Sequence, residues 1–245
     1  MRQNVIHLEK FYGSKLGHAA QSMVMRRVDT IWPNLDGKEI LGFGYASPYI
    51  KPYLNHSKRL VLAMPGAQGA IAKHTRRGFN TCLVHDDFLP FADAQFDNII
   101  VAHGLEEAEN VPALLNELWR ITKPEGRIIV IAPNRGGLWA RSEKSPFGSG
   151  RPFSKSQLRQ FLRTAKYEPV HWSGALYAPP VSFLVKKPML RLFERFGETV
   201  WPGFSGLVLV EAIKRLYAEP SNRDAQRVPR PVFGTAPIGN TAPRR

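Results

Sequence analysis

The chain has 245 residues, 43% of them apolar, and carries a net charge of +14. This size and composition suit one α/β domain with a full core, or one domain followed by a tail. Cys82 is the single cysteine, so an internal disulfide is excluded, and we interpret it as a small buried side chain. The sequence shows no secretory leader and no apolar run of the roughly 18 residues that span a bilayer. We therefore expect a cytoplasmic protein without stable membrane insertion.

The positive charge favours acidic partners, such as nucleic acid, an anionic lipid surface or a polyanionic substrate. However, the Lys and Arg residues are spread along the chain, and no block of five like charges occurs. A charged, solvated surface explains the same composition. Charge alone therefore does not identify a partner.

Strand-like and helix-like segments alternate along the first half of the chain. Strands are predicted at residues 39–45, 59–64, 80–84, 96–103 and 127–132, and helices at 48–55, 67–76 and 111–122. The strand segments are rich in Val, Ile, Leu and Phe, and the last helix has its leucines on one face. This alternation is typical of repeated βαβ units, and it predicts a mostly parallel sheet covered on both faces.

The second half of the chain is less regular. Residues 134–152 are predicted to form a long loop, Ser154 to cap a helix over 155–164, and two further strands to lie at 168–172 and 207–210. An insertion over 173–204 separates these two strands. The chain is thus predicted to hold one domain over 1–218, followed by a basic, disordered tail over 219–245.

A helix is predicted inside the insertion, from Pro188 to Gly197. Its apolar side chains share one face: Met189, Leu192, Phe193 and Phe196. Three interpretations stay open. The helix could be a lid over a substrate pocket, a helix on a membrane surface, or a helix packed on the core of the domain.

The stretch LGFGYASPY, residues 41–49, follows the first predicted strand and has the glycines of a ligand-binding turn. The dinucleotide pattern G-x-G-x-x-G fails at Ser47, and the second strand ends at Met64 without the acid that a ribose would need. A phosphate-binding P-loop is excluded because no Gly-Lys-Ser/Thr follows. The histidines form no metal-binding motif and have no cysteine partners, so we predict no metal site.

Two further blocks carry a more specific signal. The first is LPF at residues 89–91, followed by FD at 96–97 and a strand that leads to His103 and Glu106. The second is ELWRITKPEGR at residues 117–127. With the glycine loop, these blocks resemble the class I S-adenosylmethionine-dependent methyltransferases, specifically the type 11 group, over about residues 35–170.

The resemblance implies a Rossmann-like, doubly wound, mostly parallel seven-stranded sheet with an antiparallel edge strand, which would be the last strand. It also implies S-adenosylmethionine as the cofactor. The glycine loop would hold the methionine end, which fits the preference of carboxylates for converging backbone N–H groups at a helix start. We expect Ser47 to cap that helix and Pro48 to take its first position. The acidic region after the third strand would meet the adenine amino group.

The residues that the resemblance assigns to the cofactor are Gly42, Phe43, Gly44, Tyr45, Met64, Asp86, Asp87, Phe88, Leu89 and His103, with His85 as an alternative to the two aspartates. His103 and Glu106 would lie near the reacting sulfonium, and are the candidates for a catalytic role. Methyl transfer from a sulfonium depends mainly on proximity and orientation, so the absence of a catalytic triad does not exclude activity.

The chain departs from the family pattern at two acids. Ile40 stands where an acid usually precedes the loop, and Glu39 is out of phase by one residue, on the opposite face of the strand. The ribose-binding acid is replaced by Met64 or Pro65. Losing one charged hydrogen bond, worth roughly 1.5–3 kcal/mol, would weaken binding about ten- to a hundredfold. The alternative to methyl transfer is therefore a non-catalytic binding or regulatory protein that acts through its basic surface.

The methyl acceptor is expected above the carboxyl ends of the strands. The loop over 134–152 leaves the fifth strand there, and its Asn134, Arg135, Trp139 and Arg141 are the candidate substrate-binding residues. Residues 11–17 could also cover the pocket. RNA is one acceptor that the net charge would suit, although the sequence lacks the aromatic and basic patterns of dedicated RNA modules. The acceptor is not identified by the sequence.

Overall fold

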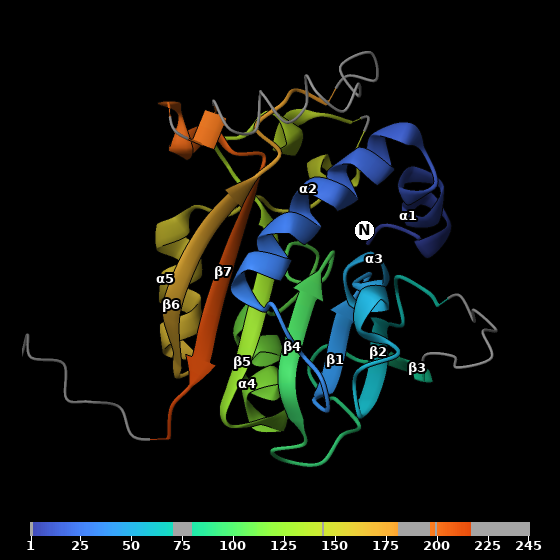
Figure 1. Cartoon of the computed structure of the whole chain (residues 1–245), viewed down its shortest axis with the longest axis vertical. Helices are drawn as coiled ribbons and strands as arrows, with labels where there is room; N and C mark the ends of the chain where they lie inside the picture. Colours follow the sequence, from blue (N-terminus) through green and yellow to red (C-terminus); the bar gives the residue numbers. More distant parts are fainter. Residues whose placement is uncertain (1, 71–79, 144, 181–196, 199, 217–245) are drawn as a thin grey trace, which may run out of the picture.

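The computed structural model describes residues 2–70, 80–143, 145–180, 197–198 and 200–216. Its seven strands form one sheet in the order β3-β2-β1-β4-β5-β7-β6 (Figure 1). In chain order the strands are β1 (Glu39–Gly44), β2 (Arg59–Pro65), β3 (Asn80–Val84), β4 (Phe96–Ala102), β5 (Thr122–Pro133), β6 (Tyr167–Ala175) and β7 (Leu207–Lys214). Each predicted strand is thus present, and β5, β6 and β7 are longer than predicted.

The sheet is parallel except at β7, which pairs antiparallel with both β5 and β6. The predicted doubly wound, mostly parallel seven-stranded sheet is confirmed, and so is the antiparallel direction of the last strand. That strand lies one place inside the edge, with β6 outside it. The reversal of order between β1 and β4 places the carboxyl ends of these strands beside each other at a topological switch point, where ligands bind in such sheets.

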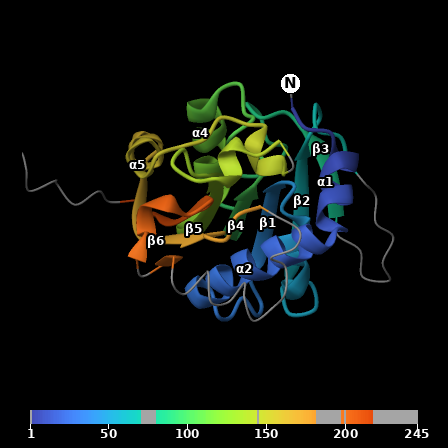
Figure 2. The ribbon, with the colours of Figure 1, turned by 90° about the horizontal axis from the view of Figure 1, so that it is seen from above.

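Helices cover both faces of the sheet (Figure 2). One face is covered by α2 (Lys15–Ile31) and the short α3 (Ser47–Ile50), and the other by α4 (Val111–Ile121) and α5 (Lys155–Thr164). Neighbouring strand residues point to opposite faces, so Ile40 packs in the first core cluster and Leu41 in the second. This burial on both faces explains why the strands read as continuous apolar runs.

Local signals explain where the predicted helices begin. The side chain of Asn110 caps α4, and Ser154 caps α5 through a capping box with Gln157, as predicted for Ser154. The helix predicted over 48–55 is instead α3 followed by a 3₁₀ turn over Lys51–Tyr53. A helix was predicted over 67–76. Residues 66–68 form a turn, and residues 71–79 lie outside the described residues, so most of that prediction stays untested.

Two N-terminal helices were not predicted, α1 (Val5–Tyr12) and α2. Their start signals are present in the sequence, because the side chains of Asn4 and Ser14 accept hydrogen bonds from the first turns. A Cβ at Gly17 would lie 2.0 Å from the carbonyl oxygen of Phe11, so only glycine permits this close approach of the two helices. The result is a helical hairpin in which α2 runs diagonally over one face of the sheet and α1 lies beyond the carboxyl ends of the strands (Figure 1).

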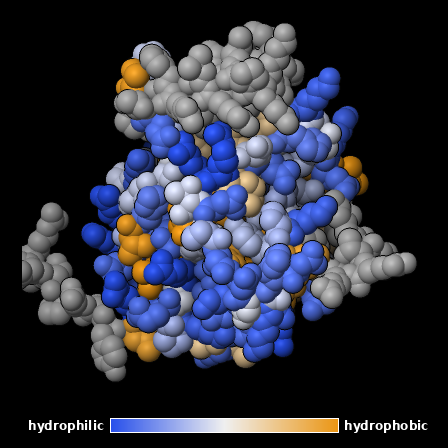
Figure 3. Space-filling model, in the orientation of Figure 1, coloured by the Kyte–Doolittle hydropathy of each residue, from blue (hydrophilic) through white to orange (hydrophobic). Residues whose placement is uncertain are grey.

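The outer surface is mainly hydrophilic on the face that Figure 3 shows, with isolated hydrophobic side chains. Among the described residues, no helix is long and apolar enough to cross a bilayer. Residues 188–196 of the helix predicted in the insertion, and the tail over 219–245, lie outside the described residues. The predicted domain boundary and the three interpretations of that helix therefore stay predictions.

Candidate active site

The glycine loop packs tightly at the end of β1. Gly44 has a φ of +76°, and a Cβ there would lie 2.4 Å from the carbonyl oxygen of Ala102 on β4. Both the left-handed conformation and the contact require glycine. The prediction that Ser47 caps the following helix is wrong, because α3 begins at Ser47 and its cap residue, Ala46, makes no side-chain cap hydrogen bond. Pro48 does lie in the first turn.

His103 lies directly after β4 and is buried, with a φ of +50°. A non-glycine residue in the left-handed region is strained, and such strain gathers at functional sites. Its Nε2 lies 2.8 Å from the Tyr12 hydroxyl, which lies 2.7 Å from the hydroxyl of Tyr49. The N-terminal helix, the glycine loop helix and the end of β4 thus meet in one buried hydrogen-bond chain.

Glu106 extends this group. Its Oε1 lies 3.5 Å from Nδ1 of His103, and only 3% of the residue is exposed. Neither carboxyl oxygen has a hydrogen-bond partner of good geometry among the described residues. Burial raises the pKa of Glu106 to about 8 and lowers the pKa of His103 to about 3. At pH 7 the two groups are therefore a neutral carboxyl beside a neutral imidazole, and not an ion pair.

Aromatic rings surround this neutral pair. Phe147 stacks on His103 at a centroid distance of 4.8 Å, and Tyr45 stacks on Tyr12 at 5.6 Å. Trp139, a candidate for substrate binding, packs edge-on against Phe147 and donates its indole N–H to the carbonyl of Ala178. It is 1% exposed, and so belongs to the wall behind the site. The predicted involvement of Tyr12's segment is matched by direct contacts with His103.

The acidic region after β3 places only one carboxylate inward. Asp86 is buried and forms a bidentate ion pair with Arg2, whereas Asp87 and the alternative His85 are exposed. Phe88 is 69% exposed beside them. Leu89 is fully buried, and packs in the core cluster under α4. Asp86 is therefore the buried one among the sequence candidates for the adenine amino group, and its assignment to adenine stays a prediction.

Sequence reasoning missed Gln68. It follows β2, in the turn where the ribose acid is lacking, and it is 1% exposed. Its Nε2 donates to the carbonyl of His103, while its Oε1 has no partner among the described residues. The signal that could have found it is a polar side chain close behind Met64, which is itself buried in the core.

The remaining candidates take two different positions. Asn134 is buried, and its Nδ2 donates to the carbonyls of Gly203 and Ser205, so it fixes the returning chain before β7. Arg135 and Arg141 are exposed at the carboxyl end of the sheet. These two cations stay predictions for substrate binding, while Asn134 has a structural role that needs no substrate.

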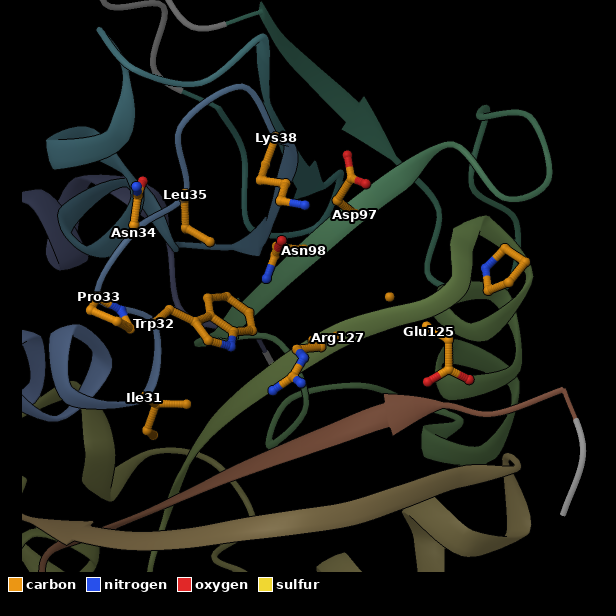
Figure 4. Close-up of a pocket in the computed structure, with 12 residues that line it drawn as sticks. Ile31, Trp32, Pro33, Asn34, Leu35, Lys38, Asp97, Asn98, Glu125 and Arg127 are labelled. Atoms are coloured by element: carbon orange, nitrogen blue, oxygen red, sulfur yellow. The ribbon is translucent and has the colours of Figure 1, made fainter. Parts of the chain in front are cut away.

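A cavity of about 390 Å³ opens at the opposite end of the sheet, below the amino ends of β4 and β5 (Figure 4). Asn98 and Arg127 point toward it, and Trp32 and Leu35 line it from the loop after α2. It is separate from the predicted cofactor residues, which gather at the carboxyl ends. In the part of the chain that the structure describes, no cluster of three or more His, Cys, Asp or Glu side chains is placed to hold a metal ion.

Comparison with known proteins agrees with this geometry. Residues 41–130 match the family model described as a methyltransferase domain. A demethylmenaquinone methyltransferase of Corynebacterium glutamicum is 30% identical over 94 residues, which are 38% of this chain and 41% of that protein. Over residues 41–130 the chain is therefore similar to the methyltransferase domain family, which agrees with the resemblance to the type 11 group. The match spans less than half the length of this curated relative.

Solved structures share the methyltransferase fold at low sequence identity. A S-adenosylmethionine-dependent methyltransferase of Thermotoga maritima superimposes with a TM-score of 0.62 at 18% identity, covering 86% of this chain and 96% of that one. The [4+2]-cyclase SpnF superimposes with a TM-score of 0.56 at 16% identity, covering 79% of this chain and 81% of that one. Since the second protein is named for a cyclisation, this methyltransferase fold does not by itself fix the reaction.

Proposed function

We propose that this methyltransferase transfers a methyl group from S-adenosylmethionine to an aromatic acceptor that carries a ring hydroxyl. The observation that carries the proposal is the buried, uncharged group of Tyr12, His103 and Glu106 within a shell of aromatic rings. A flat apolar ring suits such walls, and one hydroxyl suits the polar atoms among them. The name of the curated relatives, demethylmenaquinone methyltransferase, supports an acceptor of the quinol type.

The residues at this end of the sheet fit the chemistry of the cofactor. The Gln68 amide oxygen and the two oxygens of the neutral Glu106 carboxyl are buried without a hydrogen-bond partner among the described residues, and S-adenosylmethionine brings hydroxyl and amino groups. Gln68 would bind a ribose hydroxyl in place of the missing acid, and Asp86 would bind the adenine amino group. The backbone N–H groups of the glycine loop and the start of α3 would hold the carboxylate. When bound, the cofactor supplies a methyl group on a positively charged sulfonium.

The chain's own residues would act by orientation. Burial lowers the pKa of His103 to about 3, so its imidazole stays neutral and would position the ring hydroxyl of the acceptor through a hydrogen bond, while the proton that the acceptor releases passes to water. Glu106 lies 3.5 Å from Nδ1 of His103 and would keep the orientation of its ring. Methyl transfer removes the charge of the sulfonium, so surroundings without fixed charge do not bind the ground state more tightly than the transition state.

The test begins with calorimetric titration of S-adenosylmethionine and S-adenosylhomocysteine. We expect micromolar binding that Gln68→Leu weakens by about tenfold, the loss of one hydrogen-bonding group. Gln95→Leu is the matched control, because Gln95 also makes one side-chain hydrogen bond to backbone but lies before β4. Absence of binding at millimolar cofactor, both by the unchanged chain and by a variant without Arg2, would overturn the proposal.

Methyl transfer is then measured with a 1,4-naphthoquinol that lacks the ring methyl, and with a short RNA for comparison. We expect label in the quinol and none in the RNA. If the cofactor binds and label enters only the RNA, the aromatic acceptor is wrong and RNA is the acceptor. A substitution in the glycine loop such as Gly44→Asp is not a useful test of cofactor binding, because any Cβ there would clash with the carbonyl oxygen of Ala102 and disturb the fold.

A further inference from the structure

Arg2 lies at the place where the proposed function puts the cofactor's adenine. Its Nη1 and Nη2 donate to the two carboxyl oxygens of Asp86 at 2.8 and 2.5 Å, and Nη2 lies 3.3 Å from the carbonyl of Gly104. Both charged side chains are less than one-tenth exposed, at 7% and 8%. The guanidinium thus bridges the ends of β3 and β4, and it uses both oxygens that an adenine amino group could approach.

Residues that follow Arg2 continue this closure. The backbone N–H of Gln3 donates to the Glu107 carboxylate at 3.1 Å, and the N–H of Val5 donates to the carbonyl of Gln68 at 2.9 Å. Leu8 is fully buried. The segment therefore contacts the chain after β2, after β3 and after β4, which are the three places from which the proposed cofactor contacts come.

The last contact of the segment is Tyr12, whose hydroxyl reaches His103 and Tyr49. The phenol of Tyr12 thus contacts His103, which is proposed to bind the ring hydroxyl of the acceptor. The segment therefore contacts the proposed adenine site through the guanidinium of Arg2, and the proposed acceptor site through the phenol of Tyr12. Arg2 Nε and Gln3 Oε1 are buried and have no hydrogen-bond partner in the part of the chain that the structure describes, so the closed arrangement is incompletely satisfied there.

We propose that residues 2–12 are a latch that closes the cofactor site through the Arg2–Asp86 pair, and that adenine displaces Arg2 from Asp86. This inference rests on the proposed function, because it concerns access to the same site. An equilibrium between closed and open forms reduces the apparent affinity by the fraction of open molecules. Removing Arg2 would favour the open form, because Asp86 would be left buried and unpaired in the closed one.

The experiment is titration of S-adenosylhomocysteine into the full chain and two variants. We expect Arg2→Ala to tighten binding by about tenfold, the effect of one charge-assisted hydrogen bond in the competing state. Arg27→Ala is the matched control, since Arg27, which lies on α2 and away from Asp86, also forms a bidentate ion pair, with Glu198. It should bind as the unchanged chain does. Arg2→Lys, which keeps the charge and loses the bidentate geometry, should give an intermediate affinity.

The outcomes separate the latch from the proposed function. Equal or weaker binding by Arg2→Ala, when the unchanged chain binds, overturns the latch alone, and weaker binding would make Arg2 a cofactor ligand. Binding by Arg2→Ala where the unchanged chain shows none supports the latch in its strongest form. If no variant binds, the proposed function fails and the latch with it.

A second measurement does not depend on affinity. Hydrogen exchange of the backbone amides over residues 5–12 should become faster when S-adenosylhomocysteine binds, and should already be fast in Arg2→Ala without ligand. A folded Arg2→Ala is recognised by unchanged exchange in β4 and β5. Slower exchange over 5–12 on ligand binding would mean that the segment closes over the cofactor, and this would overturn displacement.

Discussion

The two ends of the sheet treat their charged residues in opposite ways. At the amino end, Lys123 donates to Glu39 at 2.8 Å and to Asp97 at 2.9 Å, and all three side chains stay partly in contact with water. The hydrogen bond from Lys123 lowers the pKa of Glu39, so the carboxylate stays charged. At the carboxyl end, His103 and Glu106 are buried and neutral at pH 7. Ion pairs in contact with water thus hold the amino end, whereas the carboxyl end combines the buried Arg2–Asp86 ion pair with the uncharged pair of His103 and Glu106.

The same contrast explains the sequence blocks that carried the resemblance. Arg120 of ELWRITKPEGR donates to Glu117, to Asp93 and to the carbonyls of Leu89 and Phe91. It therefore ties the LPF block to α4. Asp97 of the FD pair accepts from the backbone of Glu39. These motifs are recognisable because they build the scaffold at the amino end, while the chemistry lies at the other end.

The sharpest test of the comparison is a change at the carboxyl end that affects only chemistry. His103→Gln should lower the rate of methyl transfer by about 10²-fold, because the hydrogen bond that positions the acceptor hydroxyl is lost. Cofactor affinity should change by much less, because the proposed adenine and ribose contacts remain. Single-turnover transfer and calorimetry measure the two effects. His56→Gln, at an exposed position, is the control, and an unchanged rate in His103→Gln would remove the positioning role.

A change at the amino end should do the reverse. Arg120→Ala should lower the free energy of unfolding by roughly 3 kcal/mol, because it leaves partly buried carboxylate and carbonyl acceptors unpaired. Urea unfolding measures this loss, and Arg163→Ala, an exposed position on α5, should lose little. Cofactor affinity of the folded variant should be unchanged. A large loss of affinity would mean that the two ends of the sheet are coupled.

Glu106→Gln tests whether charge is suppressed at the carboxyl end. Burial raises the pKa of Glu106 from an ordinary 4.5 to about 8, so the folded chain holds a proton that the unfolded chain loses. Stability from this group is therefore present below pH 4.5, and is lost as the pH rises toward 8. Glutamine does not titrate, so the variant should gain on the order of 3 kcal/mol over the unchanged chain at pH 9 and little at pH 4.

Thermal unfolding at several pH values follows this difference. Glu109→Gln, an exposed position nearby, should show no such pH dependence. A gain in stability that is constant with pH would indicate a packing effect of the amide, and would argue against a neutral carboxyl in the folded chain.

The smallest expected effect concerns the hydrogen-bond chain through the N-terminal helix. Tyr12→Phe removes the hydroxyl between His103 and Tyr49, and should cost roughly 1–2 kcal/mol of stability. Tyr53→Phe removes a more exposed hydroxyl that bonds Asp29, and should cost under about 0.5 kcal/mol. Equal losses in the two variants would show that the buried chain contributes no more than a surface contact.

The sequence by itself determined the sheet and the resemblance to a methyltransferase family. Runs of Val, Ile and Leu identify buried parallel strands, because both faces of such strands must be apolar, and Ser154 identifies a helix start through a local hydrogen bond. The blocks around Leu89 and Arg120 are equally local, so their spacing survives in the sequence. The candidate reacting residues, His103 and Glu106, followed from the resemblance.

Only the tertiary structure decided what these residues meet. Arg2 reaches Asp86 across 84 positions, and Gln68 reaches His103 across 35, so no local pattern encodes either contact. The left-handed conformation of His103 and the absent partners of Glu106 follow from how three loops converge above β1 and β4. Burial is a property of that convergence, and it is burial that makes Glu106 and His103 neutral.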